Sequence, residues 1–440
     1  MAAISHRLRS FTRRFSTQRS GGATKATILY KNPEIESDSV TLQLLSWGRG
    51  ASGQLGGGIE EIRMYPSPVA NLLLRSDQSF SLAQTPGRID VDSSSFRVGI
   101  SSGLFHSGLT IDGDLWIWGK GDGGRLGFGK EDSVFVPKLN PLFDEHSIRC
   151  VALGGLHSVA LTHKGDVFTW GYGGFGALGH SVYTRELVPR RVDGSYYCKI
   201  SAIATSGTHT AAITESGELY MWGREEGDGR LGLGLGRGPN EGGGLSVPSK
   251  VKALTVPVAS VSCGGFFTMA LTQEGQLWNW GANSNYELGR GDNLGGWKPM
   301  PVPSLEGVRI TQIACGGYHS IALTEDGKVL SWGHGGHGQL GNSSLHNQKI
   351  PTEIEALADK KIVFIASGGS SSAAITDEGK LWMWGNAKDF QLGVPGLPEI
   401  QPSPVEVNFL TEEDELAPHK VISISIGASH ALCLVSRSQL

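Results

Sequence analysis

Short runs of alternating apolar and polar residues, each ended by glycine, recur along most of the chain. Residues 310–342, ITQIACGGYHSIALTEDGKVLSWGHGGHGQLGN, show the arrangement. An apolar run ends at Gly316-Gly317, the run HSIALT alternates, and the run KVLSWG follows the turn Glu325-Asp326-Gly327. Period-two alternation between glycine turns is typical of short β-strands. Asp-Gly suits a tight hairpin, because glycine accepts a positive φ. Each unit is therefore predicted to contain three antiparallel strands, followed by a glycine-rich loop.

A Trp-Gly pair ends the third strand of each unit and marks the repeat. The tryptophans are Trp47, Trp118, Trp170, Trp222, Trp280, Trp332 and Trp384, at steps of 71, 52, 52, 58, 52 and 52 residues. A second marker opens the second strand, 12 or 13 residues before each tryptophan from Trp118 on, with one more near the C-terminus. These markers are His106, His157, His209, Phe267, His319, Ser371 and His430. Strand repeats of about 40–50 residues are typical of β-propellers.

A fourth segment of each unit carries a proline, and we expect this proline near the start of a fourth strand. The corresponding prolines are Pro68, Pro137, Pro189, Pro248, Pro303, Pro351 and Pro404. Proline cannot donate a hydrogen bond to a ladder, so this strand is predicted to form the outer edge of its sheet. Four strands per unit around an axis predict an all-β, seven-bladed propeller.

The two ends of the chain each supply half of a unit. The segment LQLLSWGRGASGQLG, which begins at Leu42, has a Trp-Gly strand without a first half. The last unit, ISIGASHALCLV, has a first half without a Trp-Gly strand. We therefore predict that the terminal segments pair in one blade and close the ring, which removes two open sheet edges. The propeller domain is expected to span residues 41–440.

This unit, with its pattern GGxHSxALTxxGxLWxWGxGxxGxLG, resembles the regulator-of-chromosome-condensation repeat over residues 41–440. The sequence is most similar to plant mitochondrial members of that family. The resemblance implies a link to organelle RNA processing, including intron splicing, and thereby to the assembly of respiratory complexes. The nuclear founder of the family is a guanine-nucleotide exchange factor, which presents one propeller face and a projecting wedge to a small GTPase. Fold alone does not select between these roles, because function depends on particular sites.

The N-terminus has the pattern of a transit peptide. Residues 1–20 contain five arginines and no acidic residue, and Ile4, Leu8, Phe11 and Phe15 share one helical face. The segment Arg13-Arg14-Phe15-Ser16 resembles a matrix-protease cleavage site. We therefore predict a mitochondrial transit peptide and linker over residues 1–40 and a matrix location. Cleavage after Phe15 would remove four arginines and make the net charge of −4 more negative by four. Chloroplast import and a basic tail without a targeting role are the alternatives.

The composition fits short strands joined by tight turns around a large core. The chain has 64 glycines among 440 residues, together with 11 tryptophans and 15 phenylalanines, which argues against disorder. Its five cysteines are odd in number and form no C-x-x-C, so neither a disulfide framework nor a zinc site is expected. No apolar run has the length of a membrane span, and we predict none.

No catalytic or cofactor motif is expected to be functional. G-x-G-x-x-G begins at Gly48, Gly119, Gly171 and Gly333, but a dinucleotide site also requires a helix that starts at the loop. Leu-Gly and a polar loop follow instead, and no GxxxxGK[ST] loop occurs. The marker histidines occupy one slot in different units, which favours packing and turn bonding over metal binding. We therefore predict no enzymatic activity, no cofactor and no metal.

Light sensing is also not expected. The plant ultraviolet-B photoreceptor of this family uses a Gly-Trp-Arg-His-Thr motif. The segments of this chain that match the motif begin at Gly265, Gly317 and Gly369, and all three lack its tryptophan.

Residues that differ between units are the candidates for binding. The position two residues after each Trp-Gly tryptophan varies, and we call it the variable slot. We predict a binding site formed by Arg49, Lys120, Tyr172, Arg224 and His334, since equivalent propeller positions share one face. Such side chains could meet phosphates and stack on bases, and a solvated loop rim is the alternative. Insertions at residues 57–98 and 225–245 and the acidic run 411–416 also distinguish single units.

Together these patterns predict a non-enzymatic scaffold in the mitochondrial matrix that supports RNA processing and intron splicing. Its partners are expected to be proteins, namely mitochondrial RNA-processing factors, with local RNA contact as an open possibility at the variable face. A guanine-nucleotide exchange factor for a small GTPase is the main alternative, although no matching wedge is visible. A ubiquitin-pathway adaptor is a third alternative, which no second domain supports.

Overall fold

The computed structural model describes residues 27–29, 39–75, 81–82, 86–88, 97–194, 198–235, 244–409 and 419–437. The predicted transit peptide and linker, residues 1–40, lie outside the described residues except for 27–29 and 39–40. The acidic run 411–416 also lies outside them.

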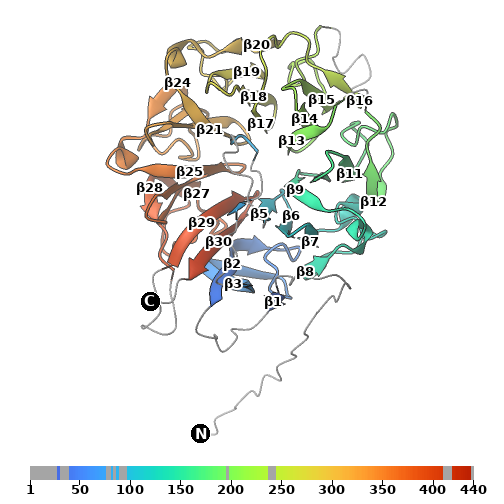
Figure 1. Cartoon of the computed structure of the whole chain (residues 1–440). Helices are drawn as coiled ribbons and strands as arrows, with labels where there is room; N and C mark the ends of the chain where they lie inside the picture. Colours follow the sequence, from blue (N-terminus) through green and yellow to red (C-terminus); the bar gives the residue numbers. More distant parts are fainter. Residues whose placement is uncertain are drawn as a thin grey trace.

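Seven antiparallel sheets surround one axis, as Figure 1 shows, and this confirms the predicted propeller. We number the blades from the first complete one. From the inner to the outer strand, blade 1 contains β5 (Arg97–Ser102), β6 (His106–Ile111), β7 (Asp114–Gly119) and β8 (Val134–Leu139). Blade 2 contains β9 (Ile148–Leu153), β10 (His157–Thr162), β11 (Val167–Gly171) and β12 (Glu186–Arg191). Blade 3 contains β13 (Ile200–Thr205), β14 (His209–Thr214), β15 (Leu219–Arg224) and β16 (Gly244–Lys250).

The remaining blades repeat this order. Blade 4 contains β17 (Ser260–Cys263), β18 (Phe267–Leu271), β19 (Leu277–Gly281) and β20 (Gly296–Pro301). Blade 5 contains β21 (Ile310–Cys315), β22 (His319–Thr324), β23 (Val329–Gly333) and β24 (Gln348–Glu353). Blade 6 contains β25 (Ile362–Ser367), β26 (Ser371–Thr376), β27 (Leu381–Asn386) and β28 (Ile400–Glu406). Blade 7 contains β29 (His419–Ile426), β30 (His430–Arg437), β2 (Ser39–Gly50) and β3 (Glu61–Arg75).

Short elements complete the described chain. Two of them, β1 (Thr27–Leu29) and β4 (Ser81–Leu82), add a fifth strand to blade 7 and to blade 1. The 3₁₀ turns are η1 (Asp122–Gly124), η2 (Pro141–Phe143), η4 (Pro303–Leu305) and η5 (Glu355–Leu357). No described helix is long and apolar enough to cross a membrane. The glycine-rich loops after the Trp-Gly strands lead into turns and not into α-helices within the described residues.

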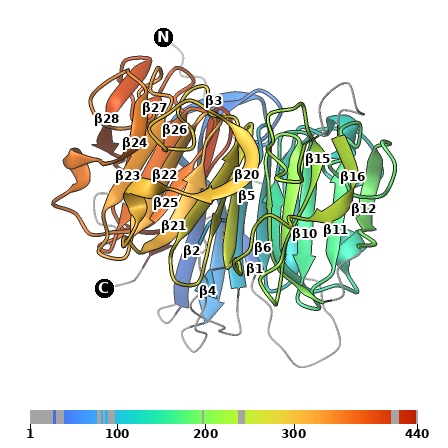
Figure 2. The ribbon, with the colours of Figure 1, turned by 90° about the horizontal axis from the view of Figure 1, so that it is seen from above.

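The chain termini close the ring, as the half units predicted. β2 pairs antiparallel with β30 from Thr41↔Arg437 to Gly48↔His430, and its other edge pairs with β3. Figures 1 and 2 show these blue and red strands side by side in one blade. The closing blade is therefore continuous only because the N-terminal strands β3 and β2 meet the C-terminal strands β30 and β29 at the β2–β30 pairing.

The hydrophobic core lies between neighbouring sheets. Each of the seven clusters of buried apolar residues joins two adjacent blades, and the cluster around Trp47 and Met383, for example, joins blades 6 and 7. Because every sheet buries both faces against neighbours, a single blade exposes apolar surface when a neighbour is removed.

The seven Trp-Gly tryptophans bond each blade to the one before it. All seven are fully buried, and each indole N–H donates to a backbone carbonyl at 2.8–3.0 Å. The donor–acceptor pairs are Trp118–Gln54, Trp170–Arg125, Trp222–Ala177, Trp280–Arg230, Trp332–Glu287, Trp384–Gln339 and Trp47–Gln391. The acceptor is always the residue before Leu-Gly in the preceding loop, so one type of bond links all seven blades.

The marker histidines add a second link at most of these junctions. Each imidazole Nε2 lies 2.8–3.3 Å from a hydroxyl oxygen of the next blade. The pairs are His106–Ser158, His157–Thr210, His209–Thr268, His319–Ser372 and His430–Ser107. Every one of these hydroxyls donates to the carbonyl that also accepts the tryptophan, at 2.7–2.9 Å. The hydroxyl proton is thereby used, so the imidazole must be the donor at Nε2.

The proline prediction needs two corrections. The outer strand of blade 4 is β20, whose prolines are Pro299 and Pro301, whereas Pro303 opens the 3₁₀ turn η4. The segment carries three prolines at alternate positions, and sequence spacing alone cannot show where the strand ends. The prolines also lie within the outer strands and not at their start, as Pro189 does in β12. An edge strand tolerates them there because every second N–H points away from the sheet.

The insertion between β3 and β5 reaches across the axis. β4 pairs with β5 in blade 1, whereas Arg88 forms a bridge with Gln312 of blade 5. The amide of Ile313 donates to the carbonyl of Gly87 at 2.8 Å. Gly87 has φ +83°, and a Cβ there would lie 1.9 Å from the Ile313 carbonyl oxygen. Only glycine permits this close approach, and the short segment beside β21 is visible in Figure 1.

Candidate interaction face

All seven variable slots lie on one side of the disc. The backbone N–H of each slot residue donates to the carbonyl of the residue before the marker, at 2.8–3.0 Å. The donor–acceptor pairs are Arg49–Ser429, Lys120–Phe105, Tyr172–Leu156, Arg224–Thr208, Ala282–Phe266, His334–Tyr318 and Asn386–Ser370. The structure therefore places Arg49, Lys120, Tyr172, Arg224 and His334 on a common face, one per blade. We call the seven slots and the hairpins that join the first two strands of each blade the hairpin face.

The cations of the hairpin face have carboxylate neighbours. Arg49 lies 3.6 Å from Asp389, Lys120 lies 3.1 Å from Asp122, and Arg224 pairs with Glu226. Each carboxylate neutralises the field that its partner would otherwise offer to a phosphate. The predicted basic site is thus a set of separate ion pairs around the ring.

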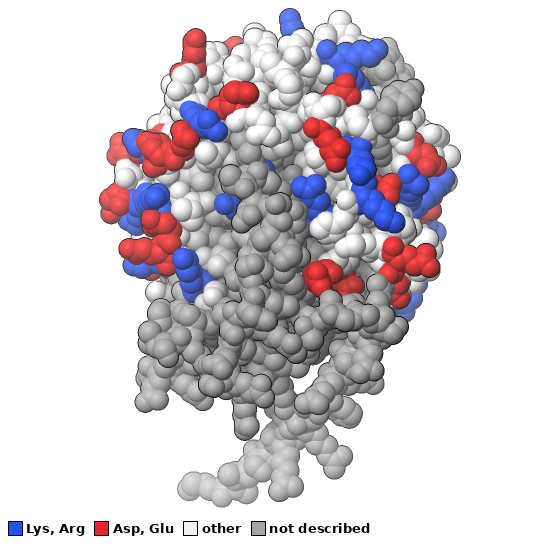
Figure 3. Space-filling view, viewed as in Figure 1, with Lys and Arg blue, Asp and Glu red and all other residues white. Residues whose placement is uncertain are grey.

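Figure 3 shows a mixed charge pattern on the side that it draws, where blue and red atoms alternate around the rim. Among the described residues in that view no large patch carries a single sign of charge. Charge of both signs at short intervals offers little long-range attraction to a polyanion, because the fields cancel within about a Debye length.

Aromatic residues on the hairpin face were not among the predicted site residues. Tyr318 and Phe105 are 44% and 38% exposed, and the ring of Phe266 stacks on Tyr318 with centroids 5.5 Å apart. Each of them stands directly before a marker position, where other blades have Leu156, Thr208, Ser370 or Ser429. This second variable position could have been found from the repeat alignment, since it changes between units as freely as the first.

The cations at two of the variable slots lie over aromatic rings. Lys120 Nζ lies 5.4 Å from the centroid of Phe105, and the Arg224 guanidinium lies 4.4 Å from that of Phe175. Cation–π contacts at partly exposed sites contribute about 0.5–1 kcal/mol each. The contacts hold the cations in defined positions.

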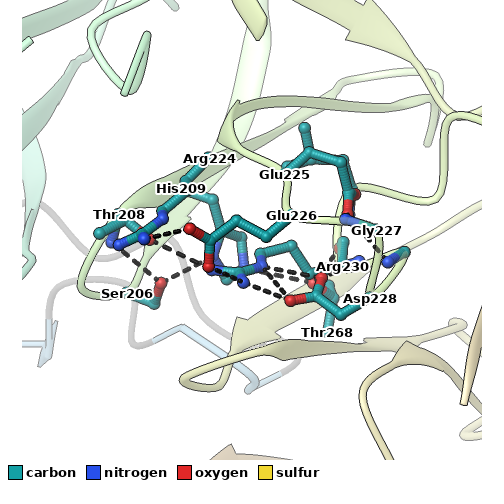
Figure 4. A network of polar contacts seen from close by, with 12 residues as sticks. Ser206, Thr208, His209, Arg224, Glu225, Glu226, Gly227, Asp228, Arg230 and Thr268 are labelled. Carbon is teal, nitrogen blue, oxygen red and sulfur yellow. Dashed lines mark hydrogen bonds and ion pairs between the residues drawn. The ribbon is translucent and has the colours of Figure 1, made fainter. Parts of the chain in front are cut away.

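The loop after β15 holds Arg224 and a second arginine in place, as Figure 4 shows. Arg230 is fully buried, donates to both carboxylate oxygens of Asp228 from Nε at 2.9 and 3.0 Å, and stacks on Phe266 at 4.6 Å. Glu225 accepts the backbone N–H groups of Gly227, Gly229 and Leu231 at 2.9–3.2 Å. Burial raises the pKa of Glu225. Side chains of the loop thus hold its conformation through hydrogen bonds to its own backbone and to one another.

A cavity of about 330 Å³ opens where the seven hairpins meet. We call it the axial mouth. Its walls include the apolar side chains of Leu104, Leu153, Phe266, Tyr318 and Ile426, and the glycines of most hairpins form its border. The charged side chains in the described lining are Arg224 and Arg230.

The buried histidines beneath this face are held neutral. Burial lowers the pKa of His157 and His430 to about 4 and that of His319 to about 3. It also lowers the pKa of His106 and His209. Within the described part of the chain, no three His, Cys, Asp or Glu side chains are grouped as a metal site would require.

The comparisons with known proteins agree with this architecture. A family model described as the RCC1-like domain matches residues 43–433. The chain is 90% identical over 444 aligned positions to the RCC1 domain-containing protein RUG3, mitochondrial, of Arabidopsis thaliana, and the match covers 100% of both proteins. It is 34% identical over 344 positions to the Ultraviolet-B receptor UVR8 of the same plant, which covers 78% of this chain and 75% of that receptor.

A solved structure has the same ring. Prp20p from Saccharomyces cerevisiae, described with its binding properties to Gsp1p and histones, superposes with a TM-score of 0.73 at 19% sequence identity. The superposition covers 92% of this chain and 94% of Prp20p. At this identity the likeness shows the fold alone.

Proposed function

The chain belongs to the RCC1-like domain family and is a mitochondrial protein, and we propose that it acts as a non-enzymatic scaffold in organelle RNA processing, including intron splicing. The observation that carries the proposal is the hairpin face. There the exposed residues differ from blade to blade, while repeated bonds hold the ring behind them. A rigid ring with one variable face suits the binding of partners. The link to RNA processing and respiratory complexes comes from the family resemblance.

We propose further that residues 1–40 direct the protein to the mitochondrial matrix and that the propeller, residues 41–440, binds the partners there. The arginine-rich, acid-free start supports delivery. The proposed partners are proteins of the RNA-processing machinery, because the cations of the hairpin face are paired with carboxylates. Local contact with RNA remains the alternative for the same face.

Genetic loss and rescue test the proposal. Loss of the protein is expected to leave particular mitochondrial transcripts unspliced or misprocessed, while general transcription stays normal. A rescue protein with Arg49, Lys120 and Arg224 all changed to Glu should fail to restore them. Its melting temperature should stay near that of the wild type, because exposed ion pairs contribute only about 0–1 kcal/mol each.

A matched control makes the rescue specific. Lys164, Lys199 and Lys328 are exposed on the opposite side of the disc, and changing these to Glu should leave rescue intact. Normal transcripts in the null mutant would refute the proposed role. An exchange assay tests the alternative function: rapid nucleotide release from a mitochondrial small GTPase on addition of the purified protein would favour an exchange factor.

A further inference from the structure

The axial mouth combines apolar walls with charge of one sign. Leu104, Leu153, Tyr318 and Ile426 contribute apolar surface, whereas the charged lining residues, within the described chain, are the arginines Arg224 and Arg230. The volume of about 330 Å³ lies at the lower end of the range for binding pockets. Such a site suits a small apolar group that carries a negative charge beside it.

The border of the mouth leaves room for an incoming side chain. Gly207 and Gly369 both line the mouth, and a Cβ added at either would meet no atom within 4 Å. Neither has a positive φ. The backbone at these two positions would accept other residues, so glycine is not required there by conformation. The lack of a side chain at both positions keeps the entrance of the mouth open.

The two arginines of the mouth differ in how exposed their guanidinium groups are. Arg230 is 1% exposed and uses its guanidinium on Asp228 and Glu226, so it has little left to offer a ligand. Arg224 is 31% exposed, and its guanidinium is oriented by the ring of Phe175 and by Glu226. Arg224 is therefore the cation that an incoming carboxylate can reach, and its position is set before binding.

We infer that the axial mouth binds an extended segment of a partner protein, which inserts one apolar or aromatic side chain and places a neighbouring Asp or Glu carboxylate on Arg224. The inference rests on the proposed function, since it names the partner chemistry at the same face. Aromatic rings and arginine around a pocket are typical anchor points of protein interfaces. Single-stranded RNA fits less well, because it requires a track of several cations along the backbone, whereas the described lining of the mouth offers one exposed arginine, Arg224.

The test selects peptides on the full propeller from a display library of random short peptides. The expected consensus contains Leu, Phe, Tyr or Trp within one or two positions of Asp or Glu. A synthetic consensus peptide should lose about tenfold or more in affinity for the Gly207→Leu and Arg224→Gln variants. Gly369→Leu provides a second way to fill the mouth if Gly207→Leu does not fold. Each variant's melting temperature is measured alongside.

Gly296→Leu is the matched control. Gly296 opens β20 at the outer rim of blade 4, away from the mouth, and a Cβ there would also meet no atom within 4 Å. This variant should bind the peptide as the wild type does. A selection that yields no consensus or a basic one would overturn the inference, as would a consensus peptide that binds Gly207→Leu unchanged.

Two further arms address other occupants. Binding of fluorescent oligo(U) that Gly207→Leu abolishes would overturn the inference in favour of RNA. A wild-type dimer that the same variant converts to monomer would overturn it in favour of a second copy of the chain. These results can be told apart from a failure of the proposed function. Misprocessed transcripts in the null mutant, together with no peptide that binds the mouth, would refute the inference alone. Normal transcripts together with specific peptide binding would refute only the RNA-processing role.

Discussion

Mild acid should destabilise the ring through its buried histidines. The folded protein holds His157 and His430 at a pKa of about 4 and His319 at about 3, whereas an unfolded imidazole has a pKa of about 6.5. Between these values the unfolded chain binds more protons than the folded one, so the free energy of unfolding falls as pH falls. From about pH 7.5 to pH 5 each of these histidines lowers the free energy of unfolding by about 2 kcal/mol, and together they lower it by about 6 kcal/mol.

That loss is comparable to the whole stability of a typical domain, about 5–15 kcal/mol. The surroundings of Nδ1, the second ring nitrogen, explain why protonation of these histidines is unfavourable in the folded protein. Nδ1 of His157, His319 and His430 is buried without a hydrogen-bond partner, so a proton placed there would be an unpaired buried charge. Urea denaturation at about pH 7.5 and about pH 5 should therefore give a much smaller free energy of unfolding at the lower pH.

The chain itself supplies the substitution that tests this reasoning. Phe267 fills the marker position of blade 4 and is fully buried, and Ser320 of the next blade still bonds to the Glu287 carbonyl at 3.0 Å. His319→Phe should therefore cost about 1 kcal/mol at neutral pH for the lost hydrogen bond. It should also reduce the difference between the two pH values by about 2 kcal/mol. An unchanged pH difference in His319→Phe would refute the explanation, and His346→Phe at an exposed position serves as the control.

Three other predictions concern closure, bonding and targeting. Deleting residues 41–56 removes most of β2 and should unfold the whole ring, because β3 and β30 both lose their partner. Deleting residues 1–20 is the control and should leave the ring folded. A cooperative thermal transition of the 41–56 deletion near the wild-type melting temperature would contradict the closure. Trp384→Phe should lower the free energy of unfolding by about 2–4 kcal/mol, because it removes the bond to the Gln339 carbonyl and leaves a cavity at a fully buried site. Trp278→Phe, whose indole bonds an exposed side chain, should lower it less in the same denaturation assay, and equal losses would count against the bonding scheme. Residues 1–40 fused to a fluorescent reporter should direct it to mitochondria, and cytosolic or nuclear fluorescence would rule this out.

The repeated unit could be predicted from sequence because its signals are local. Alternation, glycine turns and the Trp-Gly spacing each involve residues within one unit, and they determined the number of blades and the order of strands. The missing halves at the two ends also predicted closure, since an unpaired half blade would leave open edges. The same logic placed the seven variable slots on one face, because equivalent positions of a propeller are related by rotation.

Sequence spacing could not predict which residues contact the side chains at the variable slots. The partners of Arg49 and Lys120, and the stacking of Phe266 on Tyr318, depend on how loops of one blade meet hairpins of the next. The same is true of Pro303, whose place outside β20 depends on where that strand ends against β19. A repeat pattern treats each unit alone and therefore contains no information on such contacts.

The sequence by itself determined the blade, the marker positions and the face on which variation gathers. Only the tertiary structure decided that Gln391 accepts the Trp47 indole across 344 residues of sequence, and that the insertion before β5 reaches blade 5. It likewise decided that seven glycine hairpins enclose one mouth at the axis. The physical reason is that period-two alternation and turn chemistry act over a few residues, whereas the mouth exists only once the ring has closed and residues from every blade converge on it.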